Sequence, residues 1–271
     1  MGKVNDGIGW FLLIVVTVVF VGCKRTPEAK SDEVVINGTL TNSKDKIIWL
    51  HDFDGKSMHL IDSAHVRSDK ELFSFRIKVK DAGMFFVSSR NDDYALLIGN
   101  KGETIKLTGD ADDLLSTWNA KGSKETRLYL DYWDVTRKQL KRIDSVTFVF
   151  RTSHMSPEYL TTRIRLDSIF NAIMENQRDF ASHFINKNSG SLASLLVLDA
   201  KISRIPLFYE ERDINYFKKI DSSLAVTHRG NQLTVNFHER VQQIMKRIKY
   251  HQKINHMLPP GDLNPSYSPN R

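Results

Sequence analysis

Lys121-Gly122-Ser123 marks the point at which the hydrophobic pattern of this sequence changes its period. Before this stretch, apolar residues recur at every second position, as in a β-strand with one buried face. After it they recur every three or four positions, as on one face of a helix, and the hydroxyl of Ser123 can cap the first turn. We therefore predict an α+β chain in two parts, with a β-sandwich domain at residues 33–122 and a helical domain at residues 123–257.

The β part is predicted from short alternating stretches that turn residues separate. The clearest is residues 72–79, in which Phe73, Phe75 and Ile77 alternate with polar neighbours. Short strands at this close spacing are typical of an antiparallel sandwich or barrel with few helices. The other predicted strands are residues 34–40, 47–50, 58–61, 84–87, 94–98 and 104–107.

The helical part is predicted from start and stop signals around apolar faces. Ser156-Pro157-Glu158 can begin a helix, because proline fits a first helical turn, and Asn188-Ser189-Gly190 can end it. The predicted elements are a helix that begins near Ser123, a second from 156 to about 185, a third at 192–202, a segment at 206–224 and a last helix at 231–257. The positions expected to face the core are Leu128, Tyr132, Val135, Leu140 and Ile143 in the first helix, Leu160, Ile164, Ile169, Ile173 and Phe180 in the second, and Phe237, Val241, Ile244, Met245 and Ile248 in the last.

The N-terminus is similar to the signal sequence of a bacterial lipoprotein precursor. Lys3 precedes an apolar run at residues 8–21, which is short for a membrane-spanning helix of about 20 residues. The run ends in Phe20-Val21-Gly22-Cys23, which resembles a lipobox. We predict cleavage between Gly22 and Cys23 and attachment of lipid to the Cys23 thiol. The alternative is an uncleaved anchor helix with an incidental cysteine.

The residues around the predicted domains are expected to be tether and tail. Residues 24–32 are polar, contain Pro27 and are expected to form a flexible spacer. Because no acidic cluster follows Cys23, we expect the lipid to hold the domain on the periplasmic side of an envelope membrane, the outer membrane being favoured. Residues 258–271 are expected to form a disordered tail.

The composition is that of a folded protein and excludes several classes of site. Of the 271 residues, 41% are hydrophobic and 26% charged, which excludes wholesale disorder. The net charge of +7 is unchanged by removal of residues 1–22, because Lys3 and Asp6 cancel. Export makes nucleic acid an unexpected partner, so the charge is interpreted as a solvated basic surface. Cys23 is the only cysteine, which excludes an internal disulfide, a Cys-x-x-Cys pair and a cysteine zinc site.

No catalytic residue, metal site or cofactor is predicted. His51-Asp52-Phe53-Asp54-Gly55 starts like a calcium loop but lacks the further oxygens and the distal Glu, so it is interpreted as a turn whose aspartates bond their own backbone. Residues 110–113 are interpreted as a loop in the same way. The four histidines of the C-terminal half do not form an HExxH motif, and the last two do not share a helix face. They are His228, His238, His251 and His256.

Two further sets of side chains could form binding surfaces. Four aromatic residues could make a ligand surface, but packing in the core or at the domain junction is the expected role; they are Trp49, Trp118, Tyr132 and Trp133. A basic face on the last helix could contact anionic lipid, although a solvated face is favoured. It consists of Arg240, Lys246, Arg247, Lys249 and Lys253.

Several short motifs resemble one known module. They are the strand at Gly38–Leu40, Ile61-Asp62-Ser63, Tyr94-Ala95-Leu96-Leu97-Ile98, Gly102-Glu103-Thr104-Ile105, Lys121-Gly122-Ser123 and the helical stretch at residues 188–194. The module is the β-rich N-terminal domain of unknown function, with its helical linker region, of Bacteroidetes lipoproteins in the TlpA-like thiol:disulfide oxidoreductase family. The resemblance covers most of residues 33–257.

The sequence departs from that family after the helical region. The resemblance implies a thioredoxin-fold domain with a Cys-x-x-Cys motif, but Pro260-Gly261-Asp262-Leu263-Asn264-Pro265 stands where that domain would begin. A thiol–disulfide reaction needs a thiolate and a partner thiol, and Cys23 alone supplies neither once it is acylated. The family's reductase activity is therefore not expected of any residue here.

These observations favour a non-enzymatic envelope lipoprotein with a binding or scaffolding role. Its expected partners are the membrane, through the N-terminal lipid, and a periplasmic protein, in one form a thioredoxin-like redox partner. The alternative is an envelope hydrolase with an unrecognised site, which predicts a deep pocket with two or more titratable groups of shifted pKa. A third hypothesis is a truncated relic with no activity.

Overall fold

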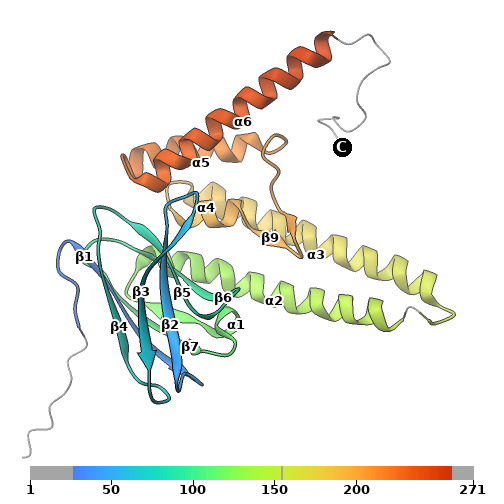
Figure 1. Ribbon diagram of the computed structural model, residues 1–271. Coiled ribbons are helices and arrows are strands. Elements are labelled where there is room, and N and C mark those ends of the chain that lie inside the picture. Colours follow the sequence, from blue (N-terminus) through green and yellow to red (C-terminus); the bar gives the residue numbers. More distant parts are fainter. Residues whose placement is uncertain (1–26, 154, 258–271) are drawn as a thin grey trace, which may run out of the picture.

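The structure of the chain is a computed structural model that describes residues 27–153 and 155–257. Gly22 and Cys23, the predicted cleavage and lipid sites, lie outside these ranges, as does the predicted tail at residues 258–271. Figure 1 shows the strands of residues 33–121 gathered at one end of the molecule and two long helices extending away from them as a hairpin. Within the described ranges, no helix is long and apolar enough to cross a bilayer.

The β part consists of two open sheets. They have the strand orders β4-β1-β7-β8 and β3-β2-β5-β6, which confirms an α+β fold but gives two sheets that do not close into a barrel. All pairings among the described strands are antiparallel except that of β1 with β7, where Val35 lies opposite Thr104. The strands are β1 (Glu33–Thr41), β2 (Lys46–Phe53), β3 (Met58–Val66), β4 (Phe73–Lys78), β5 (Gly83–Arg90), β6 (Asp93–Gly99), β7 (Thr104–Asp110) and β8 (Asn119–Lys121).

Two sequence-based predictions in this part were wrong in detail. The turn expected at residues 51–55 starts only at Asp54, because β2 continues through Phe53 and pairs with β3 on one side and β5 on the other. A short helix that the pattern did not predict, α1 (Leu114–Thr117), stands between β7 and β8.

The sandwich core lies between the two sheets. Ile36 and Phe75 from one sheet meet Leu50, Phe85 and Leu97 from the other, and all five side chains are buried. This is the alternation expected of strands with one face in the core.

Residues 27–32 lie along the sandwich. The side-chain amide of Asn37 donates to the carbonyl of Pro27 at 2.9 Å, and the backbone N–H of Ala29 donates to Oγ1 of Thr104 at 2.9 Å. Arg76 donates to the carbonyl of Glu28 at 3.3 Å. A flexible spacer would therefore be confined to residues before Pro27, which lie outside the described ranges.

The helical part contains two hairpins of helices and a small β-ribbon. The long helices α2 and α3 pack along each other, and α5 packs on α6 (Figure 1). The elements are α2 (Lys124–Thr152), α3 (Tyr159–Asn188), α4 (Ala193–Leu198), β9 (Lys201–Ile202), β10 (Ile205–Pro206), α5 (Ile214–Thr227) and α6 (Gln232–Met257).

The helix predicted at residues 192–202 is much shorter than expected. It ends at Leu198, and Lys201 and Ile202 instead form a strand that pairs with β10. Ser203 and Arg204 connect these strands with positive φ angles of 47° and 72°. Two adjacent left-handed residues form the kind of turn that favours a β-hairpin and cannot continue a helix.

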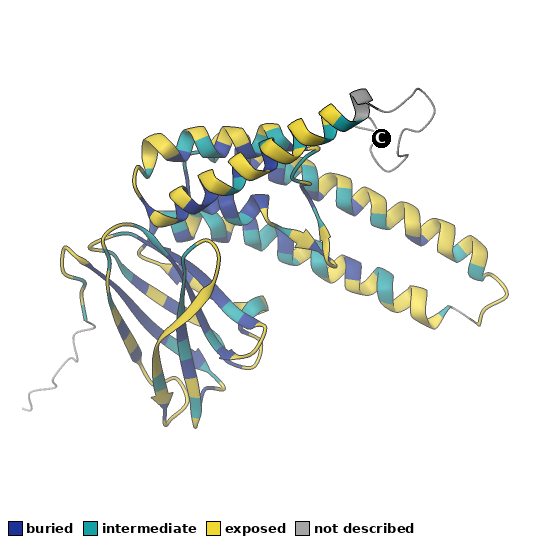
Figure 2. Ribbon diagram, turned by 45° about the horizontal axis from the view of Figure 1, so that its top comes forward, coloured by how far each residue is buried: buried dark blue, intermediate teal, exposed yellow. Residues whose placement is uncertain are grey.

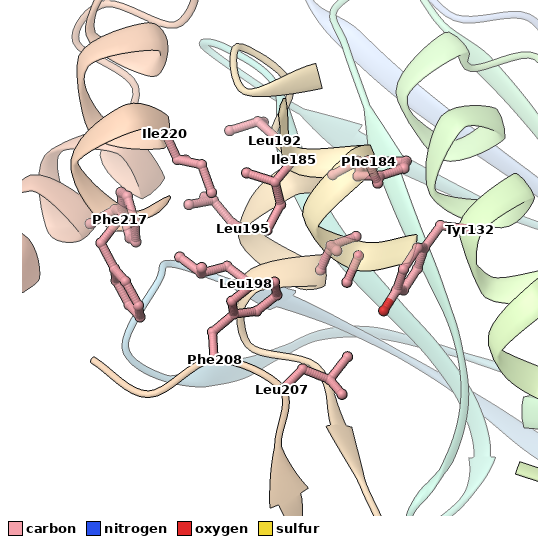
Figure 3. Packing of buried hydrophobic residues seen from close by; sticks show 14 of the residues in the cluster. Tyr132, Phe184, Ile185, Leu192, Leu195, Leu198, Leu207, Phe208, Phe217 and Ile220 are labelled. Carbon is pink, nitrogen blue, oxygen red and sulfur yellow. The ribbon is translucent and has the colours of Figure 1, made fainter. Parts of the chain in front are cut away.

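A second core joins the helices to the outer face of the sheet that contains β5 and β6. Met84, Phe86, Leu96 and Ile98 point away from the sandwich core and pack with residues of every helix from α2 to α6. Figure 3 shows Tyr132, Phe184, Leu195, Phe208 and Phe217 converging in this cluster. The two parts of the chain therefore share a continuous buried surface.

The apolar face predicted for α3 was partly wrong. Ile173 is buried, but Leu160, Ile164 and Ile169 are exposed. The buried side of the helix consists of Leu166, Ile173, Gln177, Ala181, Phe184 and Ile185. The exposed residues lie in the outer half of the hairpin, which projects beyond the other helices (Figure 2).

Candidate binding groove at the domain junction

The start of α2 is fixed to the free edge of a sheet by hydrogen bonds. Strand β6 is the last strand of its sheet, and Ile98 turns its backbone groups toward α2. The hydroxyls of Ser123 and Thr126 donate to the carbonyl of Ile98 at 2.6 and 2.7 Å, and Oγ1 of Thr126 accepts from the N–H of Ile98 at 2.8 Å. As predicted, Ser123 also caps the helix, accepting from the N–H of Thr126 at 3.3 Å. These bonds hold the two parts in one orientation.

The start of α6 is fixed to the sandwich in the same manner. Asn231 Oδ1 accepts from the N–H of Leu233 at 2.9 Å, which caps the helix, while Asn231 Nδ2 donates to the carbonyl of Ala82 at 2.7 Å. Asn236 Nδ2 donates to the carbonyl of Asp54 at 2.6 Å. Both side-chain amides are buried. Their hydrogen bonds link the start of α6 to the loops at Ala82 and Asp54, which are far away in the sequence.

A groove runs along this junction. It consists of two open hollows of about 480 and 350 Å³ that share Asp81, Ala82 and Asn231. The larger hollow is lined by residues 52–54, 77–85 and 230–233, and the smaller by residues 81–82, 100–101, 227–229 and Asn231. We refer to the two together as the junction groove.

The junction groove carries two exposed cationic side chains and one buried carboxylate oxygen without a partner. Lys101 and Arg229 line the smaller hollow, and neither forms an ion pair with another described residue. In the larger hollow, Oδ1 of Asp52 is buried and has no hydrogen-bond partner among the described residues. A groove with exposed cationic side chains that form no ion pair can bind an acidic or polar segment of another molecule.

Asp54, at the edge of the groove, has a structural role. The backbone N–H groups of Ser57 and Lys56 donate to its carboxylate at 2.8 and 2.7 Å and, with His59, lower its pKa to about 2. Hydrogen bonds to the charged form stabilise it, so Asp54 stays ionised at ordinary pH. This confirms for Asp54 the predicted bonding of an aspartate to its own backbone, whereas Asp52 lies in β2 and does not bond in this way. Asp110 does the same, accepting from the N–H of Asp112 at 2.9 Å.

Three of the four histidines singled out in the sequence have described side chains, and these three lie apart from one another. His228 lines the smaller hollow, whereas His238 contacts Asp221 at 3.0 Å and His251 contacts Glu211 at 3.1 Å. In the part of the chain that the structure describes, no group of three or more His, Cys, Asp or Glu side chains could hold a metal ion.

The aromatic residues have the packing role that was favoured. Trp118 and Tyr132 are buried in the two cores, and Trp133 donates its Nε1–H to the carbonyl of Leu115 at 3.1 Å. Trp49 is half-buried on β2. They therefore do not form one ligand surface.

The basic face predicted on α6 is divided. Arg240 pairs with Asp199 at 2.8 Å and with Glu210 at 2.8 Å, and Arg247 pairs with Glu210 and Glu211. These two side chains tie α6 to the preceding segment and are not available to a lipid surface. Lys246, Lys249 and Lys253 remain exposed to solvent.

Sequence reasoning did not predict the junction groove. Its walls come from four loops that are distant in the sequence, and no local pattern brings them together. Asn231 could have indicated a contact at this place. When the side-chain oxygen of an asparagine caps a helix, its NH₂ group is still free to donate to another part of the chain.

Comparison with protein families identifies the β part. Residues 34–129 match a family model described as "Domain of unknown function (DUF4369)". The match covers both sheets and extends into α2 as far as Tyr129, so the matched region includes the helical turn that binds Ile98. It confirms the part of the resemblance that concerns a domain of unknown function. No curated protein matches the chain.

Proposed function

We propose that this chain is a membrane-tethered envelope lipoprotein with a non-catalytic binding role, in which the junction groove receives a segment of a periplasmic partner protein. The observation that carries the proposal is the groove itself. Its walls are held by hydrogen-bonded side chains from both parts of the chain, and it presents Lys101 and Arg229, which form no ion pair with another described residue. A pre-formed groove lowers the cost of ordering an extended segment.

The class of partner is proposed from the family resemblance. The match over residues 34–129 supports the resemblance to the N-terminal module of TlpA-like lipoproteins. In those proteins the module and a thioredoxin-fold domain are parts of one chain. We propose that here the module instead docks to a separate thioredoxin-like protein.

The tether is proposed from the lipobox and from the course of residues 27–32. Lipid on Cys23 would leave only three residues, 24–26, between the acylated cysteine and Pro27, whose carbonyl is bound to Asn37. Such a short connection would keep the sandwich close to the bilayer surface.

Site-specific photo-cross-linking tests the docking. A photoreactive amino acid at Lys101, in the groove, is compared with one at Lys106, an exposed residue of β7 that does not line the groove. We expect a thioredoxin-fold protein to be cross-linked in isolated envelopes from position 101 and not from position 106. Equal capture from both positions would contradict docking in the groove, and a glycan adduct at position 101 would favour the hydrolase alternative.

Intact-mass analysis tests the tether independently. Protein extracted from membranes should lack residues 1–22 and carry added mass of acyl size, and a Cys23→Ala variant should lack that mass. An uncleaved and unmodified chain would instead indicate an N-terminal anchor helix.

A further inference from the structure

The outer end of the α2–α3 hairpin exposes large apolar side chains. Phe148, Met155, Leu160 and Ile164 have exposed fractions of 68%, 94%, 70% and 72%. We call these four residues the hairpin tip. No described residue between Ile143 and Leu166 is buried, so the last turns of α2 and the first turns of α3 lie outside the core (Figure 2).

The hairpin tip is apolar on opposite sides. Ile143 is buried between the helices, and Phe148 lies five residues on, about 140° around α2. Ile164 lies two residues before the buried Leu166, about 160° around α3. Both exposed side chains therefore point away from the neighbouring helix. A groove on a partner protein would cover only one side of the hairpin tip. The interfacial layer of a bilayer can surround the hairpin tip on all sides.

The charge around the hairpin tip is positive. Residues 138–167 contain six basic and three acidic side chains, a net charge of +3. The basic residues are Lys138, Lys141, Arg142, Arg151, Arg163 and Arg165. Two copies meeting through this end would bring like charges together, whereas an anionic lipid surface would attract it. Apolar side chains flanked by Lys and Arg are typical of segments that lie in a membrane interface.

We infer that the hairpin tip inserts into the interfacial layer of a membrane containing anionic lipid. The four apolar side chains enter the layer, and Arg151 and Arg165 lie at the level of the lipid phosphates. The inference does not depend on lipid at Cys23. It gives the protein a second membrane contact, at the far end of a helical hairpin of about 40 Å.

A single environment-sensitive fluorophore tests the insertion. Because Cys23 is the only cysteine, the full chain with Cys23→Ala and Met155→Cys can be labelled at position 155 alone. The matched control carries Val226→Cys, an equally isolated residue of α5 that is 81% exposed. Both proteins are bound to vesicles of phosphatidylglycerol mixed with phosphatidylcholine and to vesicles of pure phosphatidylcholine.

We expect the label at position 155 to shift to the blue and to be shielded from a water-soluble quencher on the mixed vesicles, and the label at position 226 to be unchanged. Arg151→Gln and Arg165→Gln should each lower the ratio of inserted to water-exposed label about fivefold. Replacing Leu160 and Ile164 by Ser should lower it at least about tenfold. Since all four substituted side chains are exposed, circular dichroism should show an unchanged fold.

Two results would overturn the inference. One is a label at position 155 that keeps its water-exposed emission on mixed vesicles while the protein is vesicle-bound. The other is a blue shift without vesicles that grows with protein concentration, which would mean that a second copy covers the hairpin tip.

Discussion

Phe85 and Phe86 are neighbours in β5, yet their side chains lie in two different hydrophobic cores. Phe85 packs between the two sheets, and Phe86 packs between its sheet and the helices. The ring centroids of Phe86 and Tyr94 are 5.1 Å apart. One strand therefore stabilises both parts of the chain.

Substitution at these two positions should separate the roles of the two cores. Each of Phe85→Ala and Phe86→Ala should cost about 3–5 kcal/mol in the free energy of unfolding, because each empties a buried site. Urea unfolding is followed by tryptophan fluorescence, to which Trp49 on β2, Trp118 in the sandwich core and Trp133 packed against that core contribute, and by far-UV circular dichroism, which is dominated by the helices.

In the unsubstituted protein, fluorescence and circular dichroism should change at the same urea concentration. In Phe86→Ala, the circular dichroism signal of the helices should be lost at a lower urea concentration than the fluorescence signal. Phe148→Ala is the matched control, since that ring is exposed and its loss should alter neither signal. Separate transitions in the unsubstituted protein would show that the two cores are independent.

Thr126→Val should destabilise the protein although the two side chains have nearly the same shape. The substitution leaves the buried N–H of Ile98 without its acceptor and removes a donor to the Ile98 carbonyl. A cost of about 1–3 kcal/mol is expected from chemical denaturation. Thr161→Val, at an exposed position of α3, should change stability by less than about 0.5 kcal/mol. Equal effects at both positions would mean that the contact with β6 is not what holds α2.

Gly122→Ala should be far more harmful than Gly102→Ala. Both glycines have positive φ, 102° and 79°, so both substitutions carry a conformational cost of about 1 kcal/mol. A Cβ at position 122 would lie 1.9 Å from the carbonyl oxygen of Thr104, whereas one at position 102 meets nothing within 4 Å. The difference in thermal unfolding temperature between the two variants measures this clash. Similar temperatures would show that the chain around position 122 can move aside.

Asp213 should make stability depend on pH in the acidic range. Burial by itself would raise its pKa, but hydrogen bonds from Arg178, the N–H of Tyr209 and Arg212 outweigh burial and lower the pKa. Arg178 Nη2 donates to Oδ1 at 2.6 Å. A lowered folded-state pKa contributes stability that is present above about pH 4 and is lost as the pH falls through the folded value.

Asp213→Asn should therefore cost about 2 kcal/mol at neutral pH and much less under acid conditions, as measured by urea midpoints at several pH values. Asp131→Asn is the control, because the ion pair of Asp131 with Arg127 at 2.6 Å is exposed and contributes little. A constant difference between Asp213→Asn and the unsubstituted protein at all pH values would contradict the pairing.

The sequence predicted the two parts of the chain and the change of structure at Gly122, because period and capping are local signals. It did not predict that helices cover the outer face of a sheet. The signal was present in the unbroken apolar runs at residues 84–87 and 94–98, which are typical of strands buried on both faces.

The misassigned side of α3 has a different cause. Leu160 and Ile164 have helical spacing and were expected in the core, but spacing shows only that residues share a side of a helix. Whether another helix covers the Leu160 and Ile164 side of α3 depends on how far the helices outside the hairpin extend, and they end before this part of the hairpin (Figure 2). The junction groove could not be predicted for a similar reason, since it depends on four loops meeting.

The parallel pairing of β1 with β7 constrains the order in which the chain can fold. As the chain emerges into the compartment where it folds, β1 can pair with β4 once residues 73–78 have appeared, but its other edge stays open until residues 104–110 follow. An open apolar strand edge invites pairing with other chains, and contacts between distant residues form slowly. The β part is therefore expected to be most prone to aggregation before β7 closes that edge.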